Sequence, residues 1–169
     1  MSEALLRKGG WAPSRQVDQS EVDKVVSWWN SIGIEANEQA LRVIRSLWGL
    51  RIQAVRGEKP VFRPETIIFA MPLDAFGAPT LPIADDIIEL LVEDGFAGPS
   101  IPAPVAHLDV NHWQVVCAVN ADGRCFAVLS EANLWMEFDC LDTMICSIVM
   151  GKAGYRRKRG LFDSFPDEP

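Results

Sequence analysis

The sequence predicts a single domain that combines amphipathic helices with a β-hairpin. The most informative stretch runs from residue 113 to 151, where two apolar runs flank an Asp-Gly pair and an amphipathic helical pattern follows. Two further helical patterns lie within the first 50 residues. With 169 residues, 49% of them hydrophobic, the chain is long enough to bury one core without disulfides or metals.

The hairpin is predicted over 115–119 and 124–129. Asp-Gly between β-rich runs is the strongest short-range hairpin signal in a sequence, so Asp122 and Gly123 are expected to be the two turn residues. In that register Cys117 and Cys125 point to opposite faces, because side chains alternate along a strand. One face is then wholly apolar and consists of Trp113, Val115, Cys117, Val119, Phe126 and Val128.

The other elements follow from apolar periodicity and from helix-capping residues. Helices are predicted at 3–8, 83–93, from Asp18 to Gly33 and from Asn37 to Gly49, with Asp18 and Asn37 as caps. Strands are predicted at 50–55 and 66–70, and loops at 71–82 and 94–104. A final helix, ending at Gly151, buries Leu141, Ile145, Ile148 and Val149.

The C-terminal end is predicted to be a loosely ordered tail. Apolar periodicity stops at Gly151, and the basic run YRRKR (155–159) precedes a mixed segment that ends in proline. The domain organisation is therefore expected to be a folded unit over 1–152 and a tail over 153–169. A basic run in such a tail more often contacts solvent or the acidic body than nucleic acid.

Charge is distributed unevenly along the chain. Residues 1–63 carry ten Lys and Arg against seven Asp and Glu, whereas residues 64–151 carry Arg124 alone against thirteen acids. The net charge is −7, and an acidic surface repels nucleic acid, so direct nucleic-acid binding by the folded body is not expected. No apolar run is long enough to span a membrane, and the first residues do not resemble a signal peptide, so a soluble cytoplasmic protein is expected.

The sequence offers little that predicts catalysis, a cofactor or a metal site. His107 and His112 are the only histidines, and their spacing directs them apart on either a strand or a helix. The four cysteines include no CxxC pair and are expected to be reduced thiols, with Cys117 inert on the apolar face. Nucleotide-binding and nucleophile-elbow motifs are absent from the sequence.

A partner-binding surface is expected on the acidic half. The helix predicted at 83–93 leaves its carboxylates on one side with no nearby cation, which fits either plain solubility or a contact with a basic partner. The connector at 131–139 is the alternative contact, with an aromatic anchor. The candidate residues of the two segments are Asp85, Asp86, Glu89, Glu93, Glu131, Trp135 and Glu137.

Two stretches resemble the SUKH superfamily of immunity proteins. The first is LLRKGGWAPSRQVD (5–18), which matches a short helix followed by a Gly-Trp-x-Pro-x-Arg-x-Val segment in the third branch of that superfamily. The second starts at Pro104 and continues through VCAVNADGRCFAVLSEANLWMEFDCLDTMICSIVMGK, which is similar to a late hairpin, a connector and a final helix. The likeness covers most of residues 4–152. The family usually has Tyr where this chain has Phe126, and its connector is richer in glycine.

The resemblance implies an α+β fold in which a central antiparallel sheet is flanked by helices. It also implies a non-enzymatic antitoxin that binds and neutralises a cognate toxin domain of a bacterial polymorphic or contact-dependent system. Nucleases are prominent among such toxins. No catalytic, metal or cofactor residues are carried over from the family.

Two alternatives remain open at this point. One is an intracellular interaction or regulatory module of the same fold, which would bind an endogenous partner and protect against no toxin. The other is a small enzyme that uses Cys117 or the acidic residues Asp85, Asp86 and Glu89. Turnover that is sensitive to a thiol reagent or a chelator would favour the enzyme.

Overall fold

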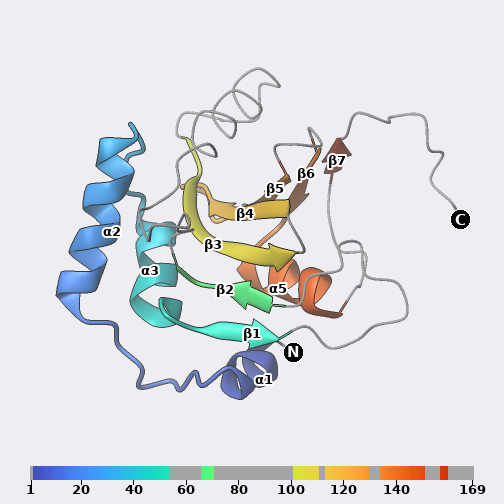
Figure 1. Ribbon diagram of the computed structural model, residues 1–169, viewed down its shortest axis with the longest axis horizontal. Coiled ribbons are helices and arrows are strands. Elements are labelled where there is room, and N and C mark those ends of the chain that lie inside the picture. The colour runs from blue at the N-terminus through green and yellow to red at the C-terminus, as the bar shows by residue number, and fades with distance from the viewer. Residues whose placement is uncertain are drawn as a thin grey trace, which may run out of the picture.

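The computed structural model describes residues 2–53, 66–70, 101–110, 113–129, 134–150 and 157–159, and these form an α+β fold (Figure 1). The predicted fold class is confirmed. The helices are α1 (Ser2–Lys8), α2 (Gln19–Ser31), α3 (Glu38–Leu47) and α5 (Leu141–Met150). The strands are β1 (Arg51–Gln53), β2 (Thr66–Ile68), β3 (Ala103–Val110), β4 (Trp113–Val119), β5 (Cys125–Leu129), β6 (Leu134–Phe138) and β7 (Arg157–Arg159).

The strands form one antiparallel sheet in chain order. The sheet has seven strands in the order β1-β2-β3-β4-β5-β6-β7, and each strand pairs with the next one in the sequence. The long strands β3 and β4 lie near the middle, while the three-residue strands β1 and β7 form the edges. Short edge strands limit the unpaired backbone that a sheet presents to other chains.

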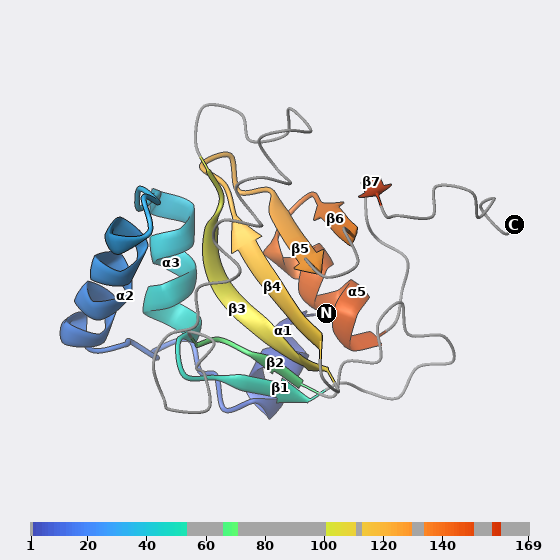
Figure 2. The ribbon, with the colours of Figure 1, turned by 45° about the horizontal axis from the view of Figure 1, so that its top comes forward.

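One face of the sheet carries the main hydrophobic core. Helix α3 packs on β3 and β4, α5 packs on β5 and β6, and α1 contacts both β1 and α5. In Figure 2, α3 lies between α2 and the sheet. Alternate strand residues point into this core together with one stripe of each helix, among them Ile52, Ile67, Leu108, Cys117, Ala127, Met136, Ile44, Leu47, Ile145 and Ile148.

The opposite face is also buried across β4, β5 and β6. Its residues form two rows across these strands, and each is at most 1% exposed. One row consists of Ala118, Phe126 and Glu137, and the other of Val116, Val128 and Trp135. The middle of the sheet is therefore enclosed on both faces, which explains why β4 and β5 are apolar on both sides.

The hairpin is confirmed, but its predicted register is wrong by one residue. Val119 pairs with Cys125 and Cys117 pairs with Ala127, so Phe126 lies opposite Ala118 on the other face. The predicted apolar face is thereby split: Cys117 belongs to the main core and Phe126 does not. The two cysteines predicted to point to opposite faces instead share the core face.

The turn chemistry explains the shift in register. Asn120, rather than Ala121, closes the hairpin: its N–H donates to the Arg124 carbonyl at 3.0 Å, and its side-chain oxygen accepts from the Arg124 N–H at 2.9 Å. The loop therefore has three residues, of which Gly123 adopts a positive φ of 82°. This is a three-residue hairpin loop that ends in a left-handed residue, the alternative to the two-residue turn.

Helices α2 and α3 begin and end where the sequence predicts. Asn37 accepts a hydrogen bond from the Ala40 N–H at 2.9 Å, so the predicted cap of α3 is confirmed. Its amide nitrogen also donates to the Val119 carbonyl at 3.0 Å, which attaches α3 to the end of β4. Asp18 occupies the cap position of α2 but makes no side-chain capping hydrogen bond, so that part of the prediction is wrong.

Two strands lie where a connector and a tail were predicted, and a third begins inside a predicted loop. The loop predicted over 94–104 overlaps the start of β3, where Pro104 sits next to an irregularity between residues 104 and 106. The predicted connector contains β6, and the predicted tail contains β7, whose residues pair with Glu137, Met136 and Trp135. Proline is tolerated in a strand at such an irregularity, which is why β3 escapes a simple pattern search. The remainder of 153–169 and the helix predicted over 83–93 lie outside the described residues.

A truncation tests the contribution of β7. A chain that ends at residue 152 is expected to lose about 1–3 kcal/mol of unfolding free energy, because β6 then becomes an unpaired edge next to a buried carboxylate. Urea unfolding of this chain and of one that ends at residue 160, which keeps β7, gives the comparison. Equal stability of these two chains would show that β7 contributes nothing.

Candidate functional site

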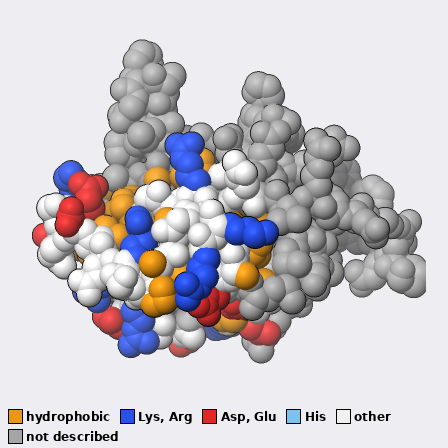
Figure 3. Space-filling model, turned by 90° about the horizontal axis from the view of Figure 1, so that it is seen from below, with side chains coloured by type: hydrophobic (Ala, Val, Ile, Leu, Met, Phe, Trp, Pro, Cys, Tyr) orange, Lys and Arg blue, Asp and Glu red, His pale blue; other side chains and the backbone are white. Residues whose placement is uncertain are grey.

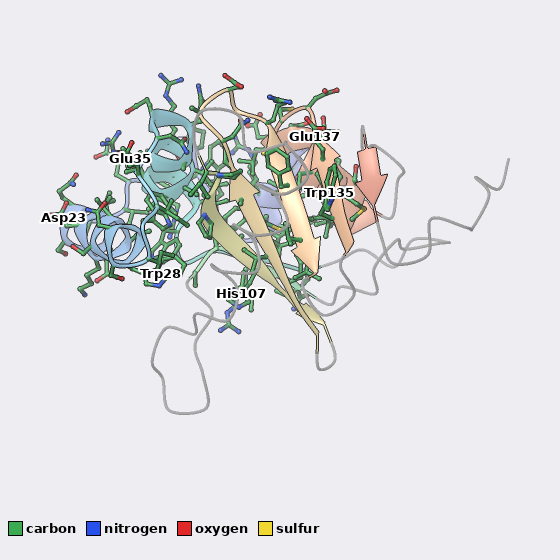
Figure 4. The ribbon with its side chains drawn as sticks, turned by 90° about the horizontal axis from the view of Figure 1, so that it is seen from above. Asp23, Trp28, Glu35, His107, Trp135 and Glu137 are labelled. Carbon is green, nitrogen blue, oxygen red and sulfur yellow. The ribbon has the colours of Figure 1, made fainter. Side chains whose placement is uncertain are left out.

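Two of the candidate partner-binding residues fall within the described part of the chain, and both are buried. Trp135 and Glu137 lie on β6, and each is 1% exposed. Figure 4 shows them together on this strand, away from His107 on β3, from which β4 and β5 separate them. The prediction that Trp135 and Glu137 contribute to an exposed contact is therefore wrong. Asp85, Asp86, Glu89, Glu93 and Glu131 lie outside the described residues, so that part of the acidic surface stays a prediction.

Glu137 has a structural partner in the hairpin turn. Nη1 of Arg124 donates to the Glu137 carboxylate at 2.8 Å, and Nη2 contacts the exposed Asp122 carboxylate at 3.3 Å. Hydrogen bonds to Glu137 and then Asp122 raise the pKa of Arg124. The guanidinium thus joins the turn to β6 and offsets the charge of a carboxylate that would be costly to bury alone.

His107 is part of the sheet. It lies on β3 with its Nδ1 3.1 Å from the Ala70 carbonyl oxygen, and it pairs with Ile68 on one side and Val116 on the other. His112 lies outside the described residues. Within the ranges that the structure describes, no group of three or more His, Cys, Asp or Glu is placed to hold a metal ion.

The cysteines divide into two buried and two more accessible thiols. Cys117 and Cys125 are buried and free, whereas Cys140 is exposed and Cys146 is intermediate. Burial raises the pKa of the Cys117 thiol to about 12, and burial is also the largest cause that raises the pKa of Cys125. Both thiols stay protonated at neutral pH and are poor nucleophiles.

These buried thiols predict a loss of stability at alkaline pH. Above the ordinary thiol pKa of 9.0 the unfolded chain ionises both cysteines while the folded chain keeps them protonated. The unfolded state then binds fewer protons, so the unfolding free energy is expected to fall by up to about 1.4 kcal/mol per pH unit for each thiol. Urea titrations between pH 8 and 10 should show a shallower fall for Cys117→Ala/Cys125→Ala than for Cys140→Ala. Identical slopes would contradict this prediction.

A basic surface lies at the edge of the sheet where β1 meets α1 and the end of α3. It is defined here as the N-terminal basic surface, and its residues are Arg7, Lys8, Trp11, Arg45, Trp48 and Arg51. The four cationic residues are exposed and the two tryptophans are half-buried. Figure 3 views the molecule from below and shows several Lys and Arg side chains on this side, among hydrophobic patches and with some Asp and Glu side chains beside them.

Close backbone contacts hold the parts of the N-terminal basic surface together. A Cβ added to Gly9 would lie 2.9 Å from the Arg51 carbonyl oxygen, so the end of α1 runs directly against β1. The Val17 N–H donates to the Arg45 carbonyl at 3.1 Å. Arg15, from the segment that resembles the Gly-Trp-x-Pro-x-Arg motif, donates from Nη2 to the Trp48 carbonyl at 2.7 Å and so secures the loop to the end of α3.

Sequence reasoning missed this surface although a signal was present. Residues 4–17 and 39–53 together contain six Lys and Arg and no Asp or Glu. Their charge is diluted when it is averaged over residues 1–63, because most of the acids of that region lie between the two stretches. The fold brings the two acid-free stretches together through the contacts of Gly9, Arg15 and Val17.

Comparisons with protein-family models, with curated proteins and with solved structures find no match to this chain. No described helix has the length and apolar character needed to cross a membrane.

Proposed function

We propose that the protein is a non-enzymatic antitoxin that acts in the cytoplasm by binding and neutralising a cognate toxin domain of a bacterial polymorphic or contact-dependent system. The partner is a protein; direct binding to nucleic acid or to a membrane is not part of the proposal. The toxin's chemistry is left open, with a nuclease as the leading class.

One observation carries the proposal: the two stretches that resemble the immunity-protein family build a single core. Helix α1, from the first stretch, contacts α5, from the second, and Leu5 belongs to the same buried cluster as Ile145. The motif residue Arg15 donates a hydrogen bond to the Trp48 carbonyl at the end of α3. The α+β architecture also agrees with the fold that the resemblance implies.

The acidic half supports the choice of a basic partner. Thirteen acids against one cation in residues 64–151 give a field that attracts the cationic cleft of a phosphate-cleaving toxin. Of these acids, Glu137 is already engaged with Arg124 inside the fold. The contact is therefore proposed at the carboxylates Asp85, Asp86, Glu89 and Glu93, with Glu131 as a further candidate.

Co-expression with the product of the neighbouring reading frame, which the proposal expects to be the cognate toxin domain, tests the proposal. The full chain is expected to restore growth and to co-purify with that domain, whereas an unrelated toxin domain of similar charge should neither be bound nor neutralised. Binding to an endogenous host protein, with no protection against the neighbouring product, would instead identify a regulatory interaction module.

A further inference from the structure

We infer that the N-terminal basic surface is a docking site for an acidic protein segment; it shares no residue with the proposed acidic contact. The inference goes beyond the proposed function, because it holds whatever the toxin's chemistry is. It starts from charge: the acid-free stretches 4–17 and 39–53 contain six of the chain's 16 Lys and Arg. The rest of the chain carries the other ten against all 23 acids, a net of −13.

Internal ion pairs neutralise this surface only in part. Arg7 bonds to Glu3 at 2.7 Å, and Arg45 lies 3.6 Å from Glu38, which Arg42 shares. These carboxylates are themselves about 60% exposed, so the pairs are solvated and contribute little to stability. No described acid pairs with Lys8 or Arg51. The contact between Gly9 and the Arg51 carbonyl oxygen brings Arg51 close to Lys8 along the backbone.

The residue types favour a protein partner. Five of the six cations in the two stretches are arginines, and the surface includes two tryptophans. Arginine and tryptophan dominate the binding energy of protein interfaces, whereas lysine is depleted there. The Arg guanidinium presents a planar fork that matches a carboxylate with two parallel hydrogen bonds.

The aromatic side chains are positioned for such a contact. The guanidinium of Arg7 lies 5.8 Å from the centre of the Trp11 ring, which holds the two side chains together as one amphipathic unit. The bond from Arg15 to the Trp48 carbonyl holds the backbone that carries the second tryptophan. Groups that are already held in place lose less conformational entropy on binding than flexible ones.

Charge also favours an acidic protein segment over a nucleic acid or a membrane as the partner of this surface. A duplex or an anionic bilayer is a continuous field of negative charge, and it would meet the net −13 of the remaining chain as well as this one edge. A short segment of Asp and Glu can contact the edge alone. The expected partner is thus a peptide-sized acidic element of another protein, with an apolar residue to pack against Trp11 or Trp48.

The test uses a fluorescein-labelled 16-residue peptide of alternating Asp and Glu with one central Leu, titrated with the full chain and followed by anisotropy at low salt. Lys8→Ala/Arg51→Ala is expected to weaken binding at least tenfold. Lys24→Glu changes the net charge equally but lies on α2, outside the surface, so it should leave binding within about twofold. Circular dichroism of both variants verifies that they are folded.

Parallel titrations distinguish the possible polyanions. The same measurement with a 16-nucleotide single-stranded DNA and with phosphatidylserine vesicles should give weaker binding than the peptide at equal ionic strength. Three results would each overturn the inference: no binding of the peptide, equal losses in the two variants, or tighter binding of DNA or vesicles that depends on Lys8 and Arg51.

Discussion

Trp29→Ala is expected to lower the unfolding free energy by about 4 kcal/mol, the largest effect of any single substitution considered. Trp29 is fully buried where α2 meets the sheet, and its indole Nε1 donates to the carbonyl of Pro104 at 3.0 Å. Alanine leaves a cavity in the core and removes the donor from a buried carbonyl. The measurement is urea unfolding monitored by circular dichroism.

Two variants separate the cavity from the hydrogen bond. Trp29→Phe keeps most of the ring volume and is expected to lose about 1–3 kcal/mol through the unpaired Pro104 carbonyl. Trp28→Ala is the matched control, since the adjacent indole is only half-buried and its nitrogen bonds to no group in the described part of the chain. Comparable losses of unfolding free energy for Trp28→Ala and Trp29→Ala would contradict the stabilising role assigned to the buried Trp29.

Arg124→Ala is expected to lower the unfolding free energy by about 3 kcal/mol, because it removes the guanidinium that pairs with the buried Glu137 carboxylate. The Glu137 side chain is 2% exposed, so solvent cannot replace the lost partner. Asp122→Ala is the control: it removes the exposed carboxylate from the same guanidinium and should change stability by less than about 0.5 kcal/mol. A similar small effect for both variants would contradict the structural role assigned to the pair.

Helices were the part of the fold that the sequence predicted best. Helix α3 carries its buried residues at helical spacing and begins at an asparagine whose side chain caps it, so local chemistry and periodicity agree. Helix α5 also carries its buried residues at helical spacing, with Ile145, Ile148 and Val149 in the core. Such patterns are visible in sequence because the information lies within one or two turns of the helix.

The register of the hairpin required information that the Asp-Gly pair does not hold. A two-residue and a three-residue loop both place glycine at a left-handed position. The choice depends on Asn120, whose side chain and backbone both bond to Arg124 and close the longer loop. Because a shift of one residue exchanges the two faces, this single turn decided which side Phe126 occupies.

The burial of Glu137 could not be predicted from the sequence for a different reason. A glutamate is rarely buried unless it is paired, and here the partner lies 13 residues away in another element. A signal did exist, since Arg124 is the only cation among thirteen acids in residues 64–151. A lone cation in an acidic region indicates a specific partner, but the sequence alone does not name which of the acids it is.

Strand β6 and the N-terminal basic surface depend on tertiary contacts. The LWMEF sequence of β6 is apolar on both faces except for Glu137, so it does not alternate as a half-exposed strand would. The basic surface consists of segments more than 20 residues apart that meet only when α1 and β1 come into contact. Neither could be derived from a local pattern.

The most direct test of the proposed function is whether the chain inhibits the purified product of the neighbouring reading frame, which the proposal expects to be a toxin. With the toxin at a concentration well above the dissociation constant, its activity is expected to fall linearly as the chain is added and to reach zero at one equivalent. Stoichiometric inhibition of this kind is what tight binding of a non-enzymatic antitoxin predicts. Undiminished toxin activity at a tenfold excess of the folded chain would contradict the proposed function.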